Sequence, residues 1–180
     1  MFMEIIITPF EGLFIIRHKV FADNRGLFVK TYNHEIFKQL NIDLEIKERY
    51  YSVSHKNVIR GMHFQTPPED HIKLVTVVAG KILDVVLDIR KHSETFGKCF
   101  SIEIDAKEGK TIYIPKGFAH GFLSLEENTI VEYNQTTVYA PSNDAGIKYD
   151  SFGFNWNIEV PVISDRDQAF VSFNQFNSPF

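Results

Sequence analysis

The chain has 180 residues, a formal net charge of −4 and one cysteine. This length suits one domain with a sizeable core over residues 1–180, and an acidic chain without a basic block is not expected to bind nucleic acid. The single cysteine, Cys99, excludes an intrachain disulfide, and the apolar start over 1–10 carries Glu4 and is too short to span a bilayer, so we expect a cytoplasmic protein with no membrane partner.

Short runs rich in β-branched and aromatic residues recur along the chain, separated by turn-forming residues such as 23–26 and 126–128. The strands that these runs predict are, in chain order, 4–8, 13–18, 27–32, 44–54, 58–65, 73–79, 82–89, 99–104, 111–114, 119–125 and 129–139. So many short strands at this spacing predict an all-β antiparallel sandwich or barrel.

Helical patterns are confined to one or two short segments. Residues 33–40 predict a helix, with Asn33 as N-cap and Ile36, Phe37 and Leu40 on one face. A second helical turn is expected within 164–170.

The stretch 44–51 alternates charged side chains with mostly apolar ones, so one face of this strand is expected to lie in water. Exposed N-terminal strands that pair across a two-fold axis would cover sheet edges that otherwise invite aggregation. We therefore expect a homodimer.

The segment 60–65 places Arg60 and His63 inside a predicted core strand, with Lys73 ten residues beyond the histidine. Burying an unpaired ion costs several kcal/mol, so these side chains face either water or a cavity. Strict alternation would send Arg60 and His63 to opposite faces, whereas a bulge at Gly61 would bring both to one site. The alternative is an exposed edge strand with ordinary surface charges.

A partial metal-binding motif follows in the second half of the chain. Gly109, Pro115, Gly117 and His120 have the spacing of the second signature of cupin jelly rolls, in which the histidine is a metal ligand. The other half of such a site is absent, because His71-Ile72-Lys73 offers an ammonium group, which has no lone pair for a metal. The pattern predicts a cupin barrel without a metal or cofactor, and a hydrogen-bonded core histidine is the alternative for His120.

A buried lysine beside a histidine base suits proton removal next to a carbonyl, because the ammonium group stabilises the developing enolate oxygen. Inversion of the carbon then requires an acid on the opposite side, for which Tyr133 is the candidate; an aromatic packed in the barrel is the alternative. A carboxylate behind His63 would fix its tautomer. Asp167, Asp84 and Asp88 are all candidates for that carboxylate, and the spacing does not choose among them.

Six blocks of the chain resemble the dTDP-4-dehydrorhamnose 3,5-epimerase family, in the family's order. These are 20–26, 58–65, 73–75, 83–90, 115–122 and 139–142. The resemblance implies a cytoplasmic, dimeric jelly roll that needs no cofactor. It also implies inversion of C3 and C5 of a nucleotide-diphosphate 4-keto sugar made for surface polysaccharide.

Carried over by position, the resemblance implies that His63 accepts the proton, Asp167 pairs with it, Tyr133 donates a proton and Lys73 lines the sugar. Asp84 is expected to support Lys73. The implied contacts to the sugar, phosphates or base are Arg25, Arg60, His120, Tyr139, Asp144 and Arg166.

Four residues depart from the pattern of the family. Lys30 stands where a glutamate is usual, Glu48 and Tyr50 replace a Gln-x-Asn pair, and Asn134 replaces a common lysine. None of them is expected to touch the acid–base residues, and the first three are expected near the nucleotide. One hypothesis is a different carrier or sugar, such as a GDP-linked 4-keto heptose, because reversed charge changes which base edge is bound. Neutral drift at an exposed rim is the alternative.

Rival functions within the same fold are a C3-only epimerase and a 3,4-ketoisomerase. A non-catalytic sugar-nucleotide-binding cupin and a metal oxygenase are rivals from other classes. The combination of His63, Asp167, Lys73 and Tyr133 favours the double epimerase.

Overall fold

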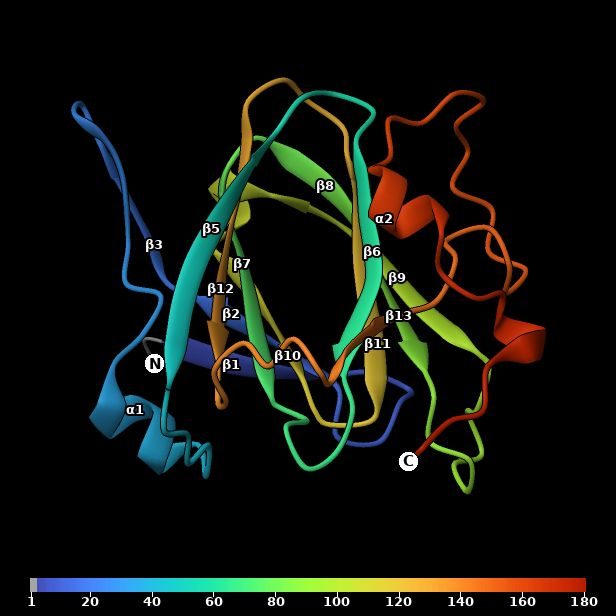
Figure 1. The fold of residues 1–180 in the computed structure, drawn as a ribbon. Coiled ribbons are helices and arrows are strands. Elements are labelled where there is room, and N and C mark those ends of the chain that lie inside the picture. Colours follow the sequence, from blue (N-terminus) through green and yellow to red (C-terminus); the bar gives the residue numbers. More distant parts are fainter. Residues whose placement is uncertain (1–2) are drawn as a thin grey trace.

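The computed structural model describes residues 3–180, and it folds into two antiparallel sheets that face each other (Figure 1). The six-stranded sheet contains, from edge to edge, β1 (Met3–Ile7), β2 (Phe14–His18), β10 (Lys110–Ile114), β7 (Lys73–Ala79), β12 (Thr129–Gln135) and β5 (Glu48–Ser54). The five-stranded sheet contains β13 (Asp144–Gly146), β6 (Ile59–Gln65), β11 (Phe118–Ser124), β8 (Lys81–Asp88) and β9 (Cys99–Asp105). The predicted all-β jelly-roll class is confirmed.

Helices are few and short, as predicted. The two α-helices are α1 (His34–Gln39) and α2 (Asp165–Gln168). There are also two single 3-10 turns, η1 (Ala106–Glu108) between β9 and β10 and η2 (Phe173–Gln175) after α2. In α1 the Asn33 side chain accepts a hydrogen bond from the backbone N–H of Ile36 at 3.1 Å, which is the predicted cap. Phe37 is buried against the outer face of the six-stranded sheet with Ile16 and Leu74.

Several predicted strand boundaries are wrong. β5 begins at Glu48 rather than at residue 44, because Leu44 and Ile46 pack against the α1 cluster instead of joining the sheet. β12 ends at Gln135 instead of residue 139. The sequence patterns also missed β3 (Val20–Asp23) and β13.

A two-stranded hairpin of β3 and β4 (Gly26–Val29) projects from the barrel at the left of Figure 1. Its large apolar side chains are exposed, with Phe28 at 61% and Leu27 at 52%. The predicted strand at 27–32 overlaps β4, whereas β3, which is also mostly exposed, was not predicted. No helix within residues 3–180 is long and apolar enough to cross a membrane.

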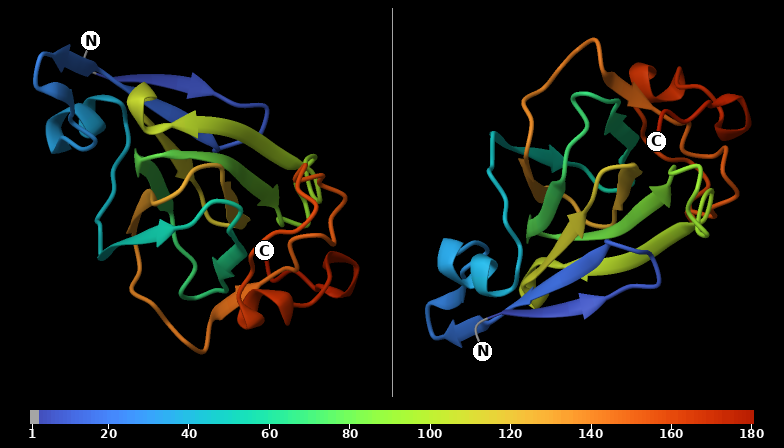
Figure 2. Two further views of the ribbon diagram at one scale, coloured as in Figure 1. Left: turned by 90° about the horizontal axis from the view of Figure 1, so that it is seen from above. Right: turned by 90° about the horizontal axis from the view of Figure 1, so that it is seen from below.

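The segment after β13, residues 147–180, covers the outer face of the five-stranded sheet, on the side of the barrel opposite α1 (Figure 2). Its anchor is Trp156, whose indole N–H donates to the carbonyl of Tyr149 at 2.9 Å in a cluster with Met62, Phe64 and Leu87. This segment carries α2 to the edge of the barrel beside β6.

The bulge predicted in β6 is present. In the pairing of β6 with β11, His63 faces His120 and Arg60 faces Phe122, so β6 contains one extra residue over this interval. Gly61 has φ +136°, and a Cβ there would lie 2.5 Å from the Cα of Gly121. The close approach of two glycines therefore sets the strand geometry from which His63 enters the barrel.

Candidate active site

A histidine–carboxylate pair joins the five-stranded sheet to the C-terminal segment. Asp167 lies in α2, where the Ser164 side chain caps the helix by accepting from the Asp167 N–H at 3.2 Å. One Asp167 oxygen is 2.8 Å from Nε2 of His63, and the other accepts the N–H of Gly61 at 3.1 Å. Phe170 packs edge-on against the imidazole with ring centroids 5.6 Å apart. The pair thus has a fixed orientation.

The charges around this pair favour a neutral imidazole beside an ionised carboxylate. Burial lowers the pKa of His63, and the hydrogen bond to Asp167 offsets this only in part. Burial of Asp167 is outweighed by its hydrogen bonds from His63 and Gly61, which keep the pKa of the carboxyl below its usual range. A carboxylate only accepts, so Nε2 carries the hydrogen and Nδ1 carries the lone pair. His63 can therefore act as a base through Nδ1.

A second histidine–carboxylate pair is fully inside the barrel. Nε2 of His120 is 2.8 Å from one oxygen of Asp84, and both side chains are buried. The other Asp84 oxygen has no hydrogen-bond partner among the described residues. His120 and His63 are register partners on neighbouring strands, so the two pairs lie side by side on the five-stranded sheet.

Lys73 enters from the opposite sheet, at the start of β7, and is only 7% exposed. Burial lowers the pKa of its ammonium group to about 8, although the charges of Asp84 and Asp144 partly oppose this. Asp84 therefore pairs with His120 and acts on Lys73 through its charge. Within residues 3–180, no three His, Cys, Asp or Glu side chains are grouped so that they could hold a metal ion.

A cavity of about 300 Å³ opens beside these groups. Its lining residues come from both sheets and from the C-terminal segment: Glu48, Tyr50, His63, Phe64, Gln65, His71, Lys73, Gln135, Tyr139, Asp144 and Arg166. A smaller adjoining cavity shares His63, His71 and Lys73 and adds His120. A base and a buried cation thus face one space, a combination suited to removing a proton next to a carbonyl.

The family model described as dTDP-4-dehydrorhamnose 3,5-epimerase matches residues 7–175. The chain belongs to this epimerase family. A curated relative, dTDP-4-dehydrorhamnose 3,5-epimerase of Escherichia coli K12, is 38% identical over 177 residues that cover 96% of each chain.

Two solved structures of related epimerases have the same fold. One is dTDP-6-deoxy-D-glucose-3,5-epimerase from Legionella pneumophila in complex with dTDP-4-keto-L-rhamnose, with a TM-score of 0.91 and 33% identity over 97% of this chain and 95% of that chain. The other is a 3'-monoepimerase from Streptomyces bikiniensis in complex with dTDP-quinovose, with a TM-score of 0.86 and 28% identity over 92% and 85% of the two chains. The chain is accordingly an isomerase, a nucleotide-sugar 3,5-epimerase.

The rim of the epimerase cavity carries paired charges. Arg166 donates to Asp144 at 2.6 Å, and the Tyr139 hydroxyl donates to the same Asp144 oxygen at 3.3 Å. The Tyr139 N–H donates to Glu48 at 2.6 Å. The structure therefore brings these four predicted residues to one mouth of the cavity.

Tyr133 is buried on the six-stranded sheet between two other rings. It is stacked on Tyr50 at 4.8 Å between centroids and an interplanar angle of 20°, and it meets His120 edge-on at 6.3 Å. The expectation that none of the departing residues touches the acid–base set is therefore wrong, because Tyr50 directly contacts the candidate acid. Asn134, by contrast, faces the outside of the sheet, where it accepts a hydrogen bond from Arg49 at 2.6 Å.

Three predicted ligand-binding cations of the epimerase lie away from the cavity within one chain. Arg25 is at the tip of the projecting hairpin, with an 85% exposed side chain paired to Asp23. Lys30 is exposed and borders a separate groove beside the hairpin. Arg60 crosses from β6 to β5, where it donates to the Ser54 hydroxyl at 3.0 Å.

Sequence reasoning missed several residues that line the epimerase cavity, among them His71 and Gln135. His71 was considered only as a lost metal ligand, and burial together with Lys73 and Lys116 lowers its pKa to about 3. Gln135 is the register partner of both Glu48 and Lys73 on the two strands beside it. Its position two residues after Tyr133 was a usable signal, because alternate residues of a strand share a face.

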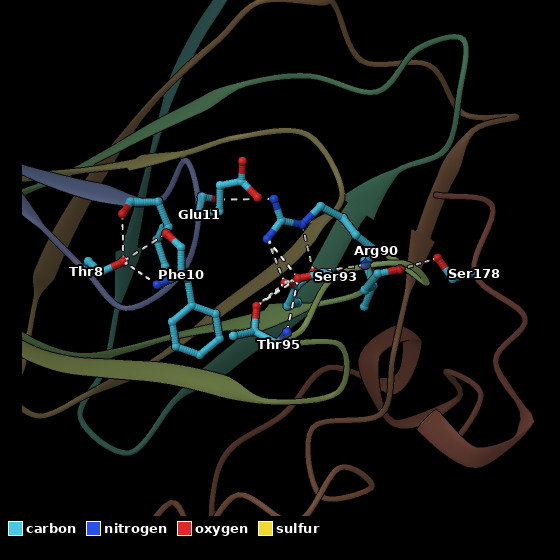
Figure 3. Close-up of polar contacts among 10 residues, drawn as sticks. Thr8, Phe10, Glu11, Arg90, Ser93, Thr95 and Ser178 are labelled. Atoms are coloured by element: carbon cyan, nitrogen blue, oxygen red, sulfur yellow. Dashed lines mark hydrogen bonds and ion pairs between the residues drawn. The ribbon is translucent and has the colours of Figure 1, made fainter.

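Asp88, the third candidate partner for His63, belongs to a different cluster of the epimerase, of which Figure 3 labels Arg90, Ser93 and Thr95. Its carboxylate accepts hydrogen bonds from Arg90 at 2.9 and 2.7 Å, from Ser93 at 2.7 Å and from Thr95 at 2.6 Å. Arg90 in turn donates to the carbonyl of Glu11 at 3.1 Å. Asp88 therefore stabilises the loop after β8, away from the imidazole.

Proposed function

We propose that the chain inverts C3 and C5 of a dTDP-linked 4-keto-6-deoxyhexose without a cofactor. The observation that carries this proposal is the oriented His63–Asp167 pair facing the same cavity as the buried Lys73. The substrate class follows from relatives whose names specify dTDP-4-dehydrorhamnose, together with the size and polarity of the cavity.

In the proposed reaction, Nδ1 of His63 removes the proton from a carbon next to the C4 ketone. The C–H electron pair moves into an enolate whose oxygen the Lys73 ammonium group stabilises. A proton from Tyr133, on the opposite sheet, then forms the new C–H bond on the other face of the carbon. The phenolate and imidazolium exchange protons with solvent, so the net reaction is a change of configuration.

The remaining predicted residues are assigned to the rest of the ligand. His120, held by Asp84, faces the adjoining cavity at the floor of the sugar site. Arg166 supplies positive charge for the diphosphate, and Tyr139, with a half-exposed ring beside Glu48 and Asp144, offers a stacking surface for the base.

We further propose that the protein acts as a homodimer in the cytoplasm. Phe28, Leu27 and Phe21 are exposed on a hairpin that projects from the barrel, and Val53 and Val78 are exposed on the outer face of the six-stranded sheet. A second copy that covered these side chains would also bring the hairpin of each subunit close to the substrate cavity of the other. Arg25 and Lys30 would then meet the nucleotide across the interface.

Solvent-deuterium labelling tests the reaction. The protein is incubated in heavy water with a dTDP-linked 4-keto-6-deoxyhexose, and label and configuration at each carbon are followed by NMR. We expect deuterium and inversion at both C3 and C5. Label at C3 alone would identify a C3-only epimerase. A product whose ketone has moved to C3 would identify a 3,4-ketoisomerase, and binding without any exchange would identify a non-catalytic cupin.

A parallel incubation with a GDP-linked 4-keto heptose tests the carrier. We expect turnover of the dTDP-linked substrate to exceed that of the GDP-linked one. The opposite preference would assign Lys30, Glu48 and Tyr50 to a changed nucleotide specificity.

A further inference from the structure

Two tyrosines are among the described residues that line the cavity, Tyr50 on its wall and Tyr139 at its mouth. Tyr50 lies on β5 directly opposite Tyr133 of β12 in the antiparallel register, and its side chain points into the barrel. The ring of Tyr133 is stacked on that of Tyr50, with centroids 4.8 Å apart. His63 enters the same cavity from the other sheet, so Tyr50 and His63 are on opposite walls.

The hydrogen bonds of Tyr50 leave its proton available. Its oxygen accepts from the side-chain amide of Gln135 at 2.7 Å. A phenol has one proton, and the oxygen that accepts from Gln135 can still donate that proton. Gln135 also lines the cavity, so the amide orients the hydroxyl within the space that the sugar is proposed to occupy.

The surroundings keep this hydroxyl protonated. Burial raises the pKa of Tyr50, and the charges of Glu48 and Asp144 raise it further. Tyr50 is therefore a donor throughout the neutral range.

We propose that Tyr50 is a second proton donor of the epimerase, acting beside Tyr133 on the face of the sugar opposite His63. This inference rests on the proposed epimerase function. In the step, the Tyr50 O–H bond breaks and its electron pair stays on the phenolate oxygen. The C–C π pair of the enolate takes the proton to form the new C–H bond, and a lone pair of the enolate oxygen re-forms the C4 carbonyl. The resulting phenolate, held by the Gln135 amide, regains a proton from solvent.

The role differs from mere packing because it depends on one hydroxyl. Tyr50→Phe retains the stacked ring and removes only that group. Loss of a proton donor slows the return of the proton on the new face, whereas proton removal by His63 continues. The signature is a fall in inversion relative to deuterium exchange at the same carbon.

The experiment measures exchange and inversion at C3 and C5 for wild type, Tyr50→Phe and Tyr133→Phe in heavy water with a dTDP-linked 4-keto-6-deoxyhexose. Tyr51→Phe is the matched control, because Tyr51 is the next residue of the same strand but is 69% exposed on the outer face. Thermal unfolding verifies that each variant is folded.

We expect Tyr50→Phe to lower the ratio of inversion to exchange at least tenfold at C3, C5 or both, and Tyr51→Phe to leave both ratios unchanged. A Gln135→Met variant, which removes the amide that orients the hydroxyl, is expected to lower the same ratio. The inference would be overturned if Tyr50→Phe had the same ratio of inversion to exchange as wild type at both C3 and C5. If wild type itself neither exchanges nor inverts, the proposed function fails instead.

Discussion

His63 and Asp167 are separated by 104 residues in the chain and by 2.8 Å in the structure. One carboxylate oxygen of Asp167 accepts the hydrogen bond from Nε2 of His63. The other oxygen accepts the backbone N–H of Gly61, at the bulge of the strand that carries His63. One side chain therefore fixes both the tautomer of the imidazole and the strand geometry that aims it. As a result, Nδ1 carries the lone pair with which His63 can accept a proton.

Asp167→Asn is expected to lower kcat by about 10²- to 10⁴-fold, the range associated with a misoriented general base. An asparagine that donates its amide to Nε2 forces the hydrogen onto Nδ1 and blocks the base. Exchange and inversion, measured in heavy water, should fall together. Asp165→Asn, an exposed neighbour in the same helix, serves as control, and a kcat for Asp167→Asn within threefold of wild type would contradict the assigned tautomer.

Lys73→Met is expected to abolish turnover yet raise the free energy of unfolding at pH 7. The pKa of Lys73 is about 8 in the fold against 10.5 for the free side chain, so protonating it there costs the fold roughly 3 kcal/mol. Between these two pH values the unfolded chain holds more protons, and wild-type stability therefore rises with pH. The advantage of the variant should shrink over the same interval.

Urea unfolding at pH 7 and at pH 10 measures this difference. Equal stability of wild type and Lys73→Met at both pH values would show that burial does not disfavour the ammonium group. Turnover of the wild type should also decline above pH 8, as the cation that stabilises the enolate loses its proton.

The positions of the barrel strands were predictable because successive side chains of a strand point to opposite faces, so apolar and polar residues alternate along the sequence. That signal is strong in β12, where Thr129, Val131 and Tyr133 are buried and the intervening Ile130 and Glu132 are partly exposed. It fails for β3, whose side chains are mostly exposed, and for Leu44 and Ile46, whose apolar side chains pack on α1. The bulge at Gly61 was predictable because glycine permits the backbone that a bulge requires.

The site was predictable in its residue types but not in its pairings. By spacing alone, Asp84, Asp88 and Asp167 were equivalent as partners for His63, and only the family resemblance selected Asp167. The fold pairs the three with His120, Arg90 and His63 respectively. These pairings depend on contacts between distant segments. The stacking of Tyr50 on Tyr133 likewise depends on the β5–β12 register, which local patterns do not fix.

Asp88→Asn is expected to lower the free energy of unfolding by about 2–4 kcal/mol and to leave kcat unchanged at 25 °C. Burial of Asp88 is outweighed by its hydrogen bonds from Arg90, Ser93 and Thr95, which lower the pKa of the carboxyl. Its stabilising effect is therefore present above the ordinary pKa of an aspartate and is lost as the pH falls through the lowered value. Denaturant unfolding at pH 7 measures the cost.

Asp150→Asn is the control for that experiment, because its ion pair with Lys148 is long, at 3.8 Å, and solvent-exposed. Such a pair contributes about 0–1 kcal/mol. A comparable loss in both variants would mean that the Asp88 cluster of Figure 3 behaves as an ordinary surface pair.

Gly61→Ala is expected to cost about 3 kcal/mol or more of stability and to reduce kcat, since both the backbone conformation and the space exclude a Cβ. The added carbon would lie 2.5 Å from Gly121 Cα and 2.9 Å from the carbonyl oxygen of His120, which are backbone atoms. Relief requires β6 to move away from β11, and His63 moves with it. Gly153→Ala is the matched control, because Gly153 has φ +78° with nothing within 4 Å of the added carbon. The control should lose about 1–2 kcal/mol with full activity, and equal losses in the two variants would show that the contact between the two strands does not position the base.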